Sequence, residues 1–421
     1  MEQREAGDGA IARGGVKARL ARGAVARRPF SALAAVAAAL VFILLAQALA
    51  TGDFAPLRLG GVRNVVNNGA VSGQQPQPQQ QYPRIPTPVL GELDTTQATL
   101  SAIAGTSPSD VWVAGSATSG AHTQGVNTNA LILHFDGSRW SSVANPASDP
   151  INGMAMVAPG DGWAVAGSNI LRYADGVWQL FQTYPAGQTN GSYLNTVSMS
   201  SPDDGWIIGS QPGNGNGPGA GILLHYTGAQ WQPYSYPSFA LNTTLLDISM
   251  YSPNDGWAVG SQYNADTVTG VVAHYQDGAW TQVGTFSGAN LVRVSPAGPD
   301  EAWAVGIGGP TSGIIVHCFN GVCQQVPSPT PNILSVVATR SSSQTWIGGD
   351  GAVIFRRDGG QWTQRNPTYH QVSLTGLLAF SDRDGWAIGQ SSGVSLPPGV
   401  VMFHCVNGSW RVYQLHVRIN G

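Results

Sequence analysis

The chain has 421 residues, a formal net charge of −3, and only 10% charged residues. Beyond residue 50 it carries thirteen arginines, no lysine and twenty acidic residues, which gives this part a net charge of −7. A nucleic-acid partner would require a basic face, so we expect none.

The first 50 residues resemble a targeting segment. Seven basic and three acidic side chains in residues 1–30 precede Ser31–Ala50, which is almost wholly apolar. Twenty such residues can span a bilayer as a helix, and the basic flank predicts a cytoplasmic N-terminus. Two fates fit, an uncleaved signal anchor or a signal peptide cleaved near Ala50. Either way, the rest of the chain is predicted to lie outside the cytoplasm, on the cell membrane or secreted.

Residues 51–97 are predicted to form a stalk. The run QQPQPQQQYPRIPTP (74–88) is rich in glutamine and proline and cannot bury a core. Such a composition indicates an extended or disordered linker.

Residues 98–421 contain seven copies of one unit of about 40–50 residues, a period typical of repeat architectures. A first tryptophan recurs as Trp112, Trp163, Trp206, Trp257, Trp303, Trp346 and Trp386. A second recurs as Trp140, Trp178, Trp231, Trp280, Trp362 and Trp410, with Cys323 at this position in copy five.

Each copy contains four short apolar runs separated by turn signals, which predicts four strands. The turn between the last two runs is Asp136-Gly137, Asp175-Gly176, Thr227-Gly228, Asp277-Gly278, Asn320-Gly321, Asp358-Gly359 or Asn407-Gly408. Asp-Gly and Asn-Gly favour two-residue hairpins. The chain is therefore predicted to be all-β, a seven-bladed β-propeller of four-stranded antiparallel blades. An open β-solenoid or two stacked sandwiches is the alternative.

The repeats resemble those of kelch and BNR (Asp-box) propellers, and the propellers of photosystem II assembly factors. Copy six, TWIGGDGAVIFRRDGGQW (345–362), carries the pattern of the last group. The resemblance covers residues 98–421 and implies a propeller fold; by analogy it permits a role in assembling membrane complexes.

No catalytic or metal site is predicted from the repeated polar residues. Histidine stands six residues before the second tryptophan position in five copies, as His134, His225, His274, His317 and His404. Residues on the third strands of neighbouring blades lie too far apart to share a metal ion, so we expect these histidines to form structural hydrogen bonds. The turn aspartates Asp161, Asp204, Asp255, Asp300 and Asp384 are expected to mimic backbone turns, and Glu301 to occupy a glycine position. We predict no cofactor.

Two charges break the repeat ten residues before the first tryptophan. Asp247 and Arg293 stand there in adjacent copies, on the predicted innermost strand. They predict either a buried salt bridge between blades or a polar contact for a ligand in the central channel.

Tyrosines collect in the variable connections of copies two to four, at Tyr184, Tyr193, Tyr234, Tyr236 and Tyr263. Loops on a rigid scaffold commonly carry recognition, and tyrosine offers a large contact area with a polar tip. These residues are candidates for a binding surface, unless their rings fold back over the blade edges.

The exported part has three cysteines. Cys318 and Cys323 flank a predicted two-residue turn and are candidates for a hairpin disulfide. The alternative is that all three are small buried apolar residues.

We therefore expect a non-catalytic extracytoplasmic propeller that binds a protein or a glycan through its loop-rich face, with a membrane contact through the N-terminal helix. The alternative is a secreted carbohydrate-active hydrolase or lyase that uses Asp247 at the channel mouth.

Overall fold

The computed structural model describes residues 93–118, 128–185, 192–211, 221–235, 237, 243–264, 267–309 and 312–417. The predicted targeting segment and most of the predicted stalk lie outside these residues. Within the described part, no helix is long and apolar enough to cross a membrane.

The described residues form one short 3₁₀ helix, η1 (Thr95–Gln97), and 28 strands in seven sheets of four consecutive antiparallel strands. Blades 1 and 2 contain β1 (Ala98–Ser107), β2 (Asp110–Thr118), β3 (Thr128–Phe135), β4 (Trp140–Ser142), β5 (Ile151–Ala158), β6 (Asp161–Ala166), β7 (Asn169–Ala174) and β8 (Val177–Thr183). Blades 3 and 4 contain β9 (Tyr193–Ser201), β10 (Asp204–Ser210), β11 (Gly221–Tyr226), β12 (Trp231–Pro233), β13 (Thr243–Ser252), β14 (Asp255–Asn264), β15 (Thr267–Gln276) and β16 (Ala279–Ser287). Blades 5 and 6 contain β17 (Asn290–Gly298), β18 (Glu301–Ile307), β19 (Gly313–Phe319), β20 (Val322–Val326), β21 (Leu334–Ser341), β22 (Gln344–Gly349), β23 (Ile354–Asp358) and β24 (Gln361–Gln364). Blade 7 contains β25 (Val372–Ala379), β26 (Asp384–Ser391), β27 (Gly399–Val406) and β28 (Ser409–Tyr413).

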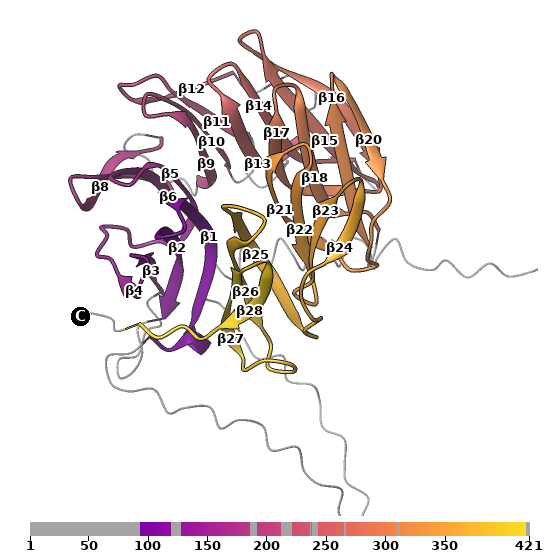
Figure 1. Ribbon diagram of the computed structural model, residues 1–421. Helices are drawn as coiled ribbons and strands as arrows, with labels where there is room; N and C mark the ends of the chain where they lie inside the picture. The colour runs from indigo at the N-terminus through magenta and orange to yellow at the C-terminus, as the bar shows by residue number, and fades with distance from the viewer. Residues whose placement is uncertain are drawn as a thin grey trace, which may run out of the picture.

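The seven sheets form a closed ring (Figure 1). The first strand of each blade contacts the first strand of the next, and β25 contacts β1, so these seven strands are innermost. Within the described ranges, the first and last blades share no strand. The ring instead closes through hydrogen bonds, from Thr375 Oγ1 to the Leu100 carbonyl at 2.7 Å and from the Leu93 N–H to the Val417 carbonyl at 2.8 Å. The predicted seven-bladed propeller is confirmed.

Every innermost strand carries a β-bulge at the same repeat position. The bulged residues are Ser101, Asn152, Asn195, Leu246, Val292, Ser335 and Thr375. Three of these side chains donate to a carbonyl of the next blade: besides Thr375, Asn152 bonds Leu194 at 3.0 Å and Ser335 bonds Leu374 at 2.7 Å. In these three blades the bulged residue therefore links its inner strand to that of the neighbouring blade.

The repeated tryptophans meet across the blade boundaries. The first tryptophan of each blade is buried. In every blade but blade 4, the second tryptophan of the next blade lies against it, with ring centroids 5.3–6.0 Å apart. The pairs are Trp112–Trp178, Trp163–Trp231, Trp206–Trp280, Trp303–Trp362, Trp346–Trp410 and Trp386–Trp140. Such edge-to-face pairs add about 0.5–1.5 kcal/mol each beyond the burial of their area.

The predicted two-residue hairpins occur in four blades. Both turn residues have positive φ in Asp175-Gly176, Asp277-Gly278, Asn320-Gly321 and Asn407-Gly408, as a type I′ turn requires.

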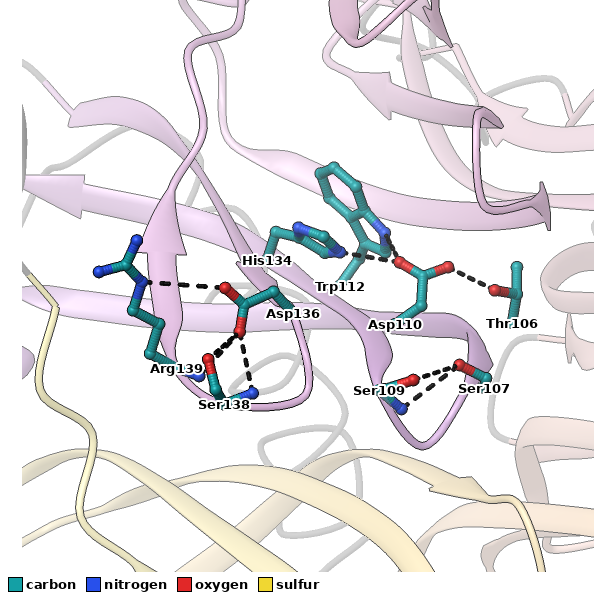
Figure 2. Close-up of polar contacts among 9 residues, drawn as sticks. All are labelled: Thr106, Ser107, Ser109, Asp110, Trp112, His134, Asp136, Ser138 and Arg139. Atoms are coloured by element: carbon teal, nitrogen blue, oxygen red, sulfur yellow. Dashed lines mark hydrogen bonds and ion pairs between the residues drawn. The ribbon is translucent and has the colours of Figure 1, made fainter.

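The prediction is wrong in the other three blades. In blade 1 the Asp136 carboxylate accepts the N–H groups of Ser138 and Arg139, each at 2.9 Å, and stabilises a longer turn (Figure 2). Blade 3 likewise has a longer turn, between Tyr226 and Trp231. In blade 6 the turn shifts by one residue to Gly359-Gly360.

Candidate functional site

A polar cluster lies beside the first tryptophan in each blade. In blade 1, His134 Nε2 lies 2.8 Å from Asp110 Oδ1, and the Trp112 indole N–H donates to the same oxygen at 2.9 Å (Figure 2). The Thr106 hydroxyl donates to the other carboxylate oxygen. The imidazole also stacks on the indole, with ring centroids 4.0 Å apart. The cluster fixes the second and third strands against each other.

The other blades repeat this arrangement with small changes. The imidazole–carboxylate pairs are His225–Asp204 at 2.8 Å, His274–Asp255 at 3.1 Å, His317–Glu301 at 2.8 Å and His404–Asp384 at 3.8 Å. In blade 2, Arg172 pairs with Asp161 at 3.2 Å, and in blade 6 Arg356 pairs with Asp358 and with Asp382.

These contacts correct two predictions. The carboxylates at the start of the second strands bind histidine or arginine rather than mimicking turns, and Glu301 takes the place of an aspartate rather than a glycine. Four of the five histidines form the structural hydrogen bonds that were expected, whereas His404 lies 3.8 Å from Asp384, too far for a hydrogen bond.

Asp247 and Arg293 follow the bulge on β13 and β17. At this position the side chain points toward the inner strand of the next blade, because a Cβ on the equivalent Gly153 would lie 2.6 Å from Thr196 Cα. Uncharged residues no larger than valine occupy this position in the other five blades, so the two charged side chains on β13 and β17 are exceptional.

Asp247 is buried between the two inner strands. Its Oδ2 accepts the Val294 N–H at 2.9 Å. Burial raises the pKa of this carboxyl from 3.8 to about 6, against the lowering effects of the nearby Arg293 charge and of hydrogen bonds from the Val294 and Ile248 backbones.

Arg293 is half-buried, and its Nη1 donates to the carbonyl of its own neighbour Val292 at 3.0 Å. Among the described residues it forms no direct ion pair, so the predicted salt bridge with Asp247 is not made. The positive charge of Arg293 lowers the pKa of the Asp247 carboxyl without direct contact. The other guanidinium N–H groups have no acceptor in the described part of the chain. They are the donors that an anionic or carbonyl group of a ligand could use.

The candidate tyrosines are held by contacts within the chain. The Tyr193 hydroxyl donates to Asn152 Oδ1 at 2.8 Å, and the Tyr234 hydroxyl donates to the Gly278 carbonyl at 2.9 Å. Tyr184 packs against the apolar core of blades 2 and 3. Burial raises the pKa of the Tyr263 hydroxyl. Tyr236 lies outside the described residues.

Cys318 and Cys405 occupy equivalent positions on the third strands of blades 5 and 7, and Cys323 stands where blade 7 has Trp410. Cys318 and Cys323 face each other across the β19–β20 hairpin and form a disulfide, with Cα atoms 4.0 Å apart. Cys405 is free and buried, and burial raises the pKa of its thiol to about 11. The disulfide replaces the aromatic–tryptophan pair found at this place in blades 1 to 4.

One group that could hold a metal ion was missed in the sequence. Asp255, His274 and Asp300 bring their ligand atoms within 4.8 Å of one another. The first two belong to the repeated cluster of blade 4, whereas Asp300 comes from blade 5. The three residues meet only because blades 4 and 5 are neighbours in the ring. From the sequence, only the sharing of a metal ion between histidines of neighbouring blades was considered, so this group was not found.

No protein-family model matches the chain, and no curated protein does. Among solved structures it is similar to YCF48 bound to D1 peptide, with a TM-score of 0.51 and 17% identity, covering 75% of this chain and 95% of that one. It is also similar to the β-propeller domain of the Trilobed protease from Pyrococcus furiosus, which has an open velcro topology, with a TM-score of 0.50 and 8% identity over 75% and 97% of the two chains. YCF48 from Cyanidioschyzon merolae has a TM-score of 0.48 and 15% identity, covering 64% of this chain and 87% of that one.

These likenesses show the fold alone. They confirm the predicted resemblance to the propellers of photosystem II assembly factors, of which YCF48 is one. The kelch and Asp-box repeat types are not confirmed.

Proposed function

We propose that the chain is a non-catalytic propeller, anchored in the membrane or secreted, that binds a protein segment at the face where its blade-to-blade connections emerge. A glycan is the alternative ligand. The observation that carries the proposal is the half-buried Arg293, the fourth residue of β17 in the inner ring, whose other guanidinium N–H groups meet no acceptor among the described residues. Arg293 therefore lies closer to the beginning of β17, where the chain arrives from blade 4, than to the end of that strand.

The polar side chains beside the first tryptophans also support a non-catalytic, scaffolding role. In each blade the described histidine or arginine beside the first tryptophan is already paired with a carboxylate. YCF48, whose fold is similar, has been seen with a D1 peptide bound, which supports peptide binding as a use of such a ring. The Cys318–Cys323 disulfide supports an oxidising compartment, in keeping with export through Ser31–Ala50.

A photo-crosslinking experiment tests the proposal. A photoreactive residue is placed in the full-length chain at Val394, exposed in the β26–β27 connection on the proposed face, or at Val322, exposed in a hairpin at the opposite end of a blade. We expect a discrete protein adduct from position 394 that weakens in Arg293→Gln and persists in Arg340→Gln, an exposed arginine at the far end of β21. Equal adducts from both positions, or none from 394, would count against the proposal.

The hydrolase alternative has one observation in its favour, because a carboxyl with a pKa of about 6 suits a general acid. Burial opposes it, since Asp247 is directed at a backbone N–H between two strands rather than at a ligand. A panel of glycan substrates decides the matter. Turnover that disappears in Asp247→Asn would establish an enzyme and overturn the non-catalytic proposal.

A further inference from the structure

The junction between blades 4 and 5 lacks the aromatic packing that joins most neighbouring blades. In blades 1 to 3, the first tryptophan is covered by a third-strand tyrosine and a fourth-strand tryptophan of the next blade, as Trp206 is by Tyr275 and Trp280. Trp257 of blade 4 instead meets Cys318 and Cys323 of blade 5, whose disulfide is much smaller than two aromatic rings. This boundary therefore lacks the interlocking rings that the boundaries between blades 1 to 4 have.

The same boundary carries a contact that the other imidazole–carboxylate pairs lack. Asp300, in the turn before β18 of blade 5, brings its Oδ1 to 4.0 Å from His274 Nε2 of blade 4. His274 Nε2 already lies 3.1 Å from Asp255 Oδ1. Two carboxylates from two blades thus face one imidazole nitrogen.

Asp300 is held firmly in this position. Its backbone has φ of +54°, a left-handed conformation that aspartate tolerates better than most residues. Its N–H donates to Asp255 Oδ2 at 3.0 Å, and its carbonyl accepts the Asn320 N–H at 3.0 Å. Gln276 Nε2 donates to Asp300 Oδ1 at 2.9 Å, which orients the carboxylate toward the histidine. The cluster is therefore preorganised.

The charges and distances fit a divalent cation. Two carboxylates this close repel each other unless a positive charge lies between them. Ligands about 2.0–2.2 Å from a zinc ion lie about 3.3 Å apart in a tetrahedral site, between the two distances observed from His274 Nε2. One imidazole with two carboxylates suits zinc better than calcium, which prefers oxygen ligands alone.

Solvent can reach the cluster from one side. The His274 side chain is 4% exposed and that of Asp255 13%, whereas that of Asp300 is 39% exposed. An ion would enter past Asp300 and keep a water molecule as its fourth ligand there, while Gln276 would remain bonded to the carboxylate as an outer partner.

We propose that His274, Asp255 and Asp300 form a zinc site that joins blade 4 to blade 5, with ligands His274 Nε2 and one oxygen of each carboxylate. The site stabilises the boundary at which the disulfide has replaced the interlocking rings. It is independent of ligand binding at the face of the ring.

The full-length chain, freed of metal with a chelator, is titrated with Zn²⁺ against a chromophoric competitor. We expect one zinc ion per chain, a rise in Tm on saturation, and the visible absorption of a four-coordinate site when Co²⁺ replaces Zn²⁺. Asp300→Asn keeps the shape of the side chain and the His274–Asp255 pair, and should weaken the affinity at least tenfold and abolish the Tm rise.

The matched control is Asp203→Asn. Asp203 is the acidic residue at the equivalent turn position in blade 3, where the preceding blade carries Arg172 instead of a histidine. This variant should bind zinc as the unaltered chain does. The proposal is overturned if the unaltered chain takes up no zinc at stoichiometric concentration, or if Asp300→Asn binds zinc as tightly as Asp203→Asn.

Discussion

Trp140 of the first blade lies edge-on against Trp386 of the last, with ring centroids 5.3 Å apart and ring planes at 88°. The pair has the same geometry as Trp163 and Trp231 within the ring, at 5.3 Å and 87°. Phe135 adds a second ring on Trp386 at 5.2 Å, as Tyr226 does on Trp163 at 4.8 Å. The joint between the chain ends is therefore built like the internal joints, although no strand crosses it.

Replacing Trp140 with alanine should destabilise the ring as much as replacing Trp231. Both are large buried side chains, so each substitution should cost about 3–5 kcal/mol of unfolding free energy. Urea denaturation of the two variants measures this. A much smaller loss for Trp140→Ala than for Trp231→Ala would mean that the first and last blades are joined more loosely than the others.

The periodicity of tryptophan and of the turn residues was enough to predict the blade count and the four consecutive strands of each blade. Those properties depend on contacts repeated within one unit. The bulge at Ser101 and its equivalents was not predictable, because it follows from packing seven strands around an axis. The Asp255–His274–Asp300 cluster was missed for the same reason, since its third member belongs to the neighbouring unit.

Asp136 shows a different limit. Its Asp-Gly sequence favours a two-residue turn, but the carboxylate accepts two backbone N–H groups and selects a longer one. Among the described residues, the side chains at the first turn position of blades 2, 4, 5 and 7 accept no such backbone bond, and the strands there run directly into the turn. Competition between side-chain and backbone hydrogen bonds therefore decides the turn.

Replacing Arg172 with histidine should leave the stability of the propeller almost unchanged, whereas replacing it with leucine should reduce that stability. The guanidinium donates to Asp161 at 3.2 Å and lies 4.9 Å above the Trp163 ring, the place that imidazole occupies in five other blades. Arg172→His keeps a donor and a stacking plane, so the unfolding free energy should change by less than about 1 kcal/mol. Arg172→Leu leaves Asp161 without its partner and should cost about 1–3 kcal/mol. Equal stability of the two variants would show that the pair contributes little.

Reduction of the Cys318–Cys323 disulfide should weaken the propeller only modestly. The bond closes a loop with a sequence separation of 5, and the chain-entropy relation gives about 2 kcal/mol for so short a loop. Thermal unfolding of the unaltered chain with and without a reductant measures the effect, and Cys318→Ala/Cys323→Ala provides the control that must not respond. If the reductant lowers the Tm of the unaltered chain and of the double variant equally, its effect does not come from this disulfide.

Asp247 should make the chain less stable as the pH rises. Its carboxyl has a folded-state pKa of about 6, above the ordinary value of 3.8, so the folded state binds the proton more tightly than the unfolded state does. The resulting stabilisation is fully present below pH 3.8 and is lost as the pH rises through about 6, a loss of about 3 kcal/mol in all.

The difference in unfolding free energy between Asp247→Asn and the unaltered chain isolates this effect, because every other group titrates in both. That difference should shift in favour of the asparagine variant between about pH 4 and pH 7 and then stay constant. Arg293→Gln removes the charge that lowers the pKa of Asp247, so in that variant the loss should occur at higher pH. A difference that does not change with pH would mean that the Asp247 carboxyl is solvated as an ordinary surface carboxyl is.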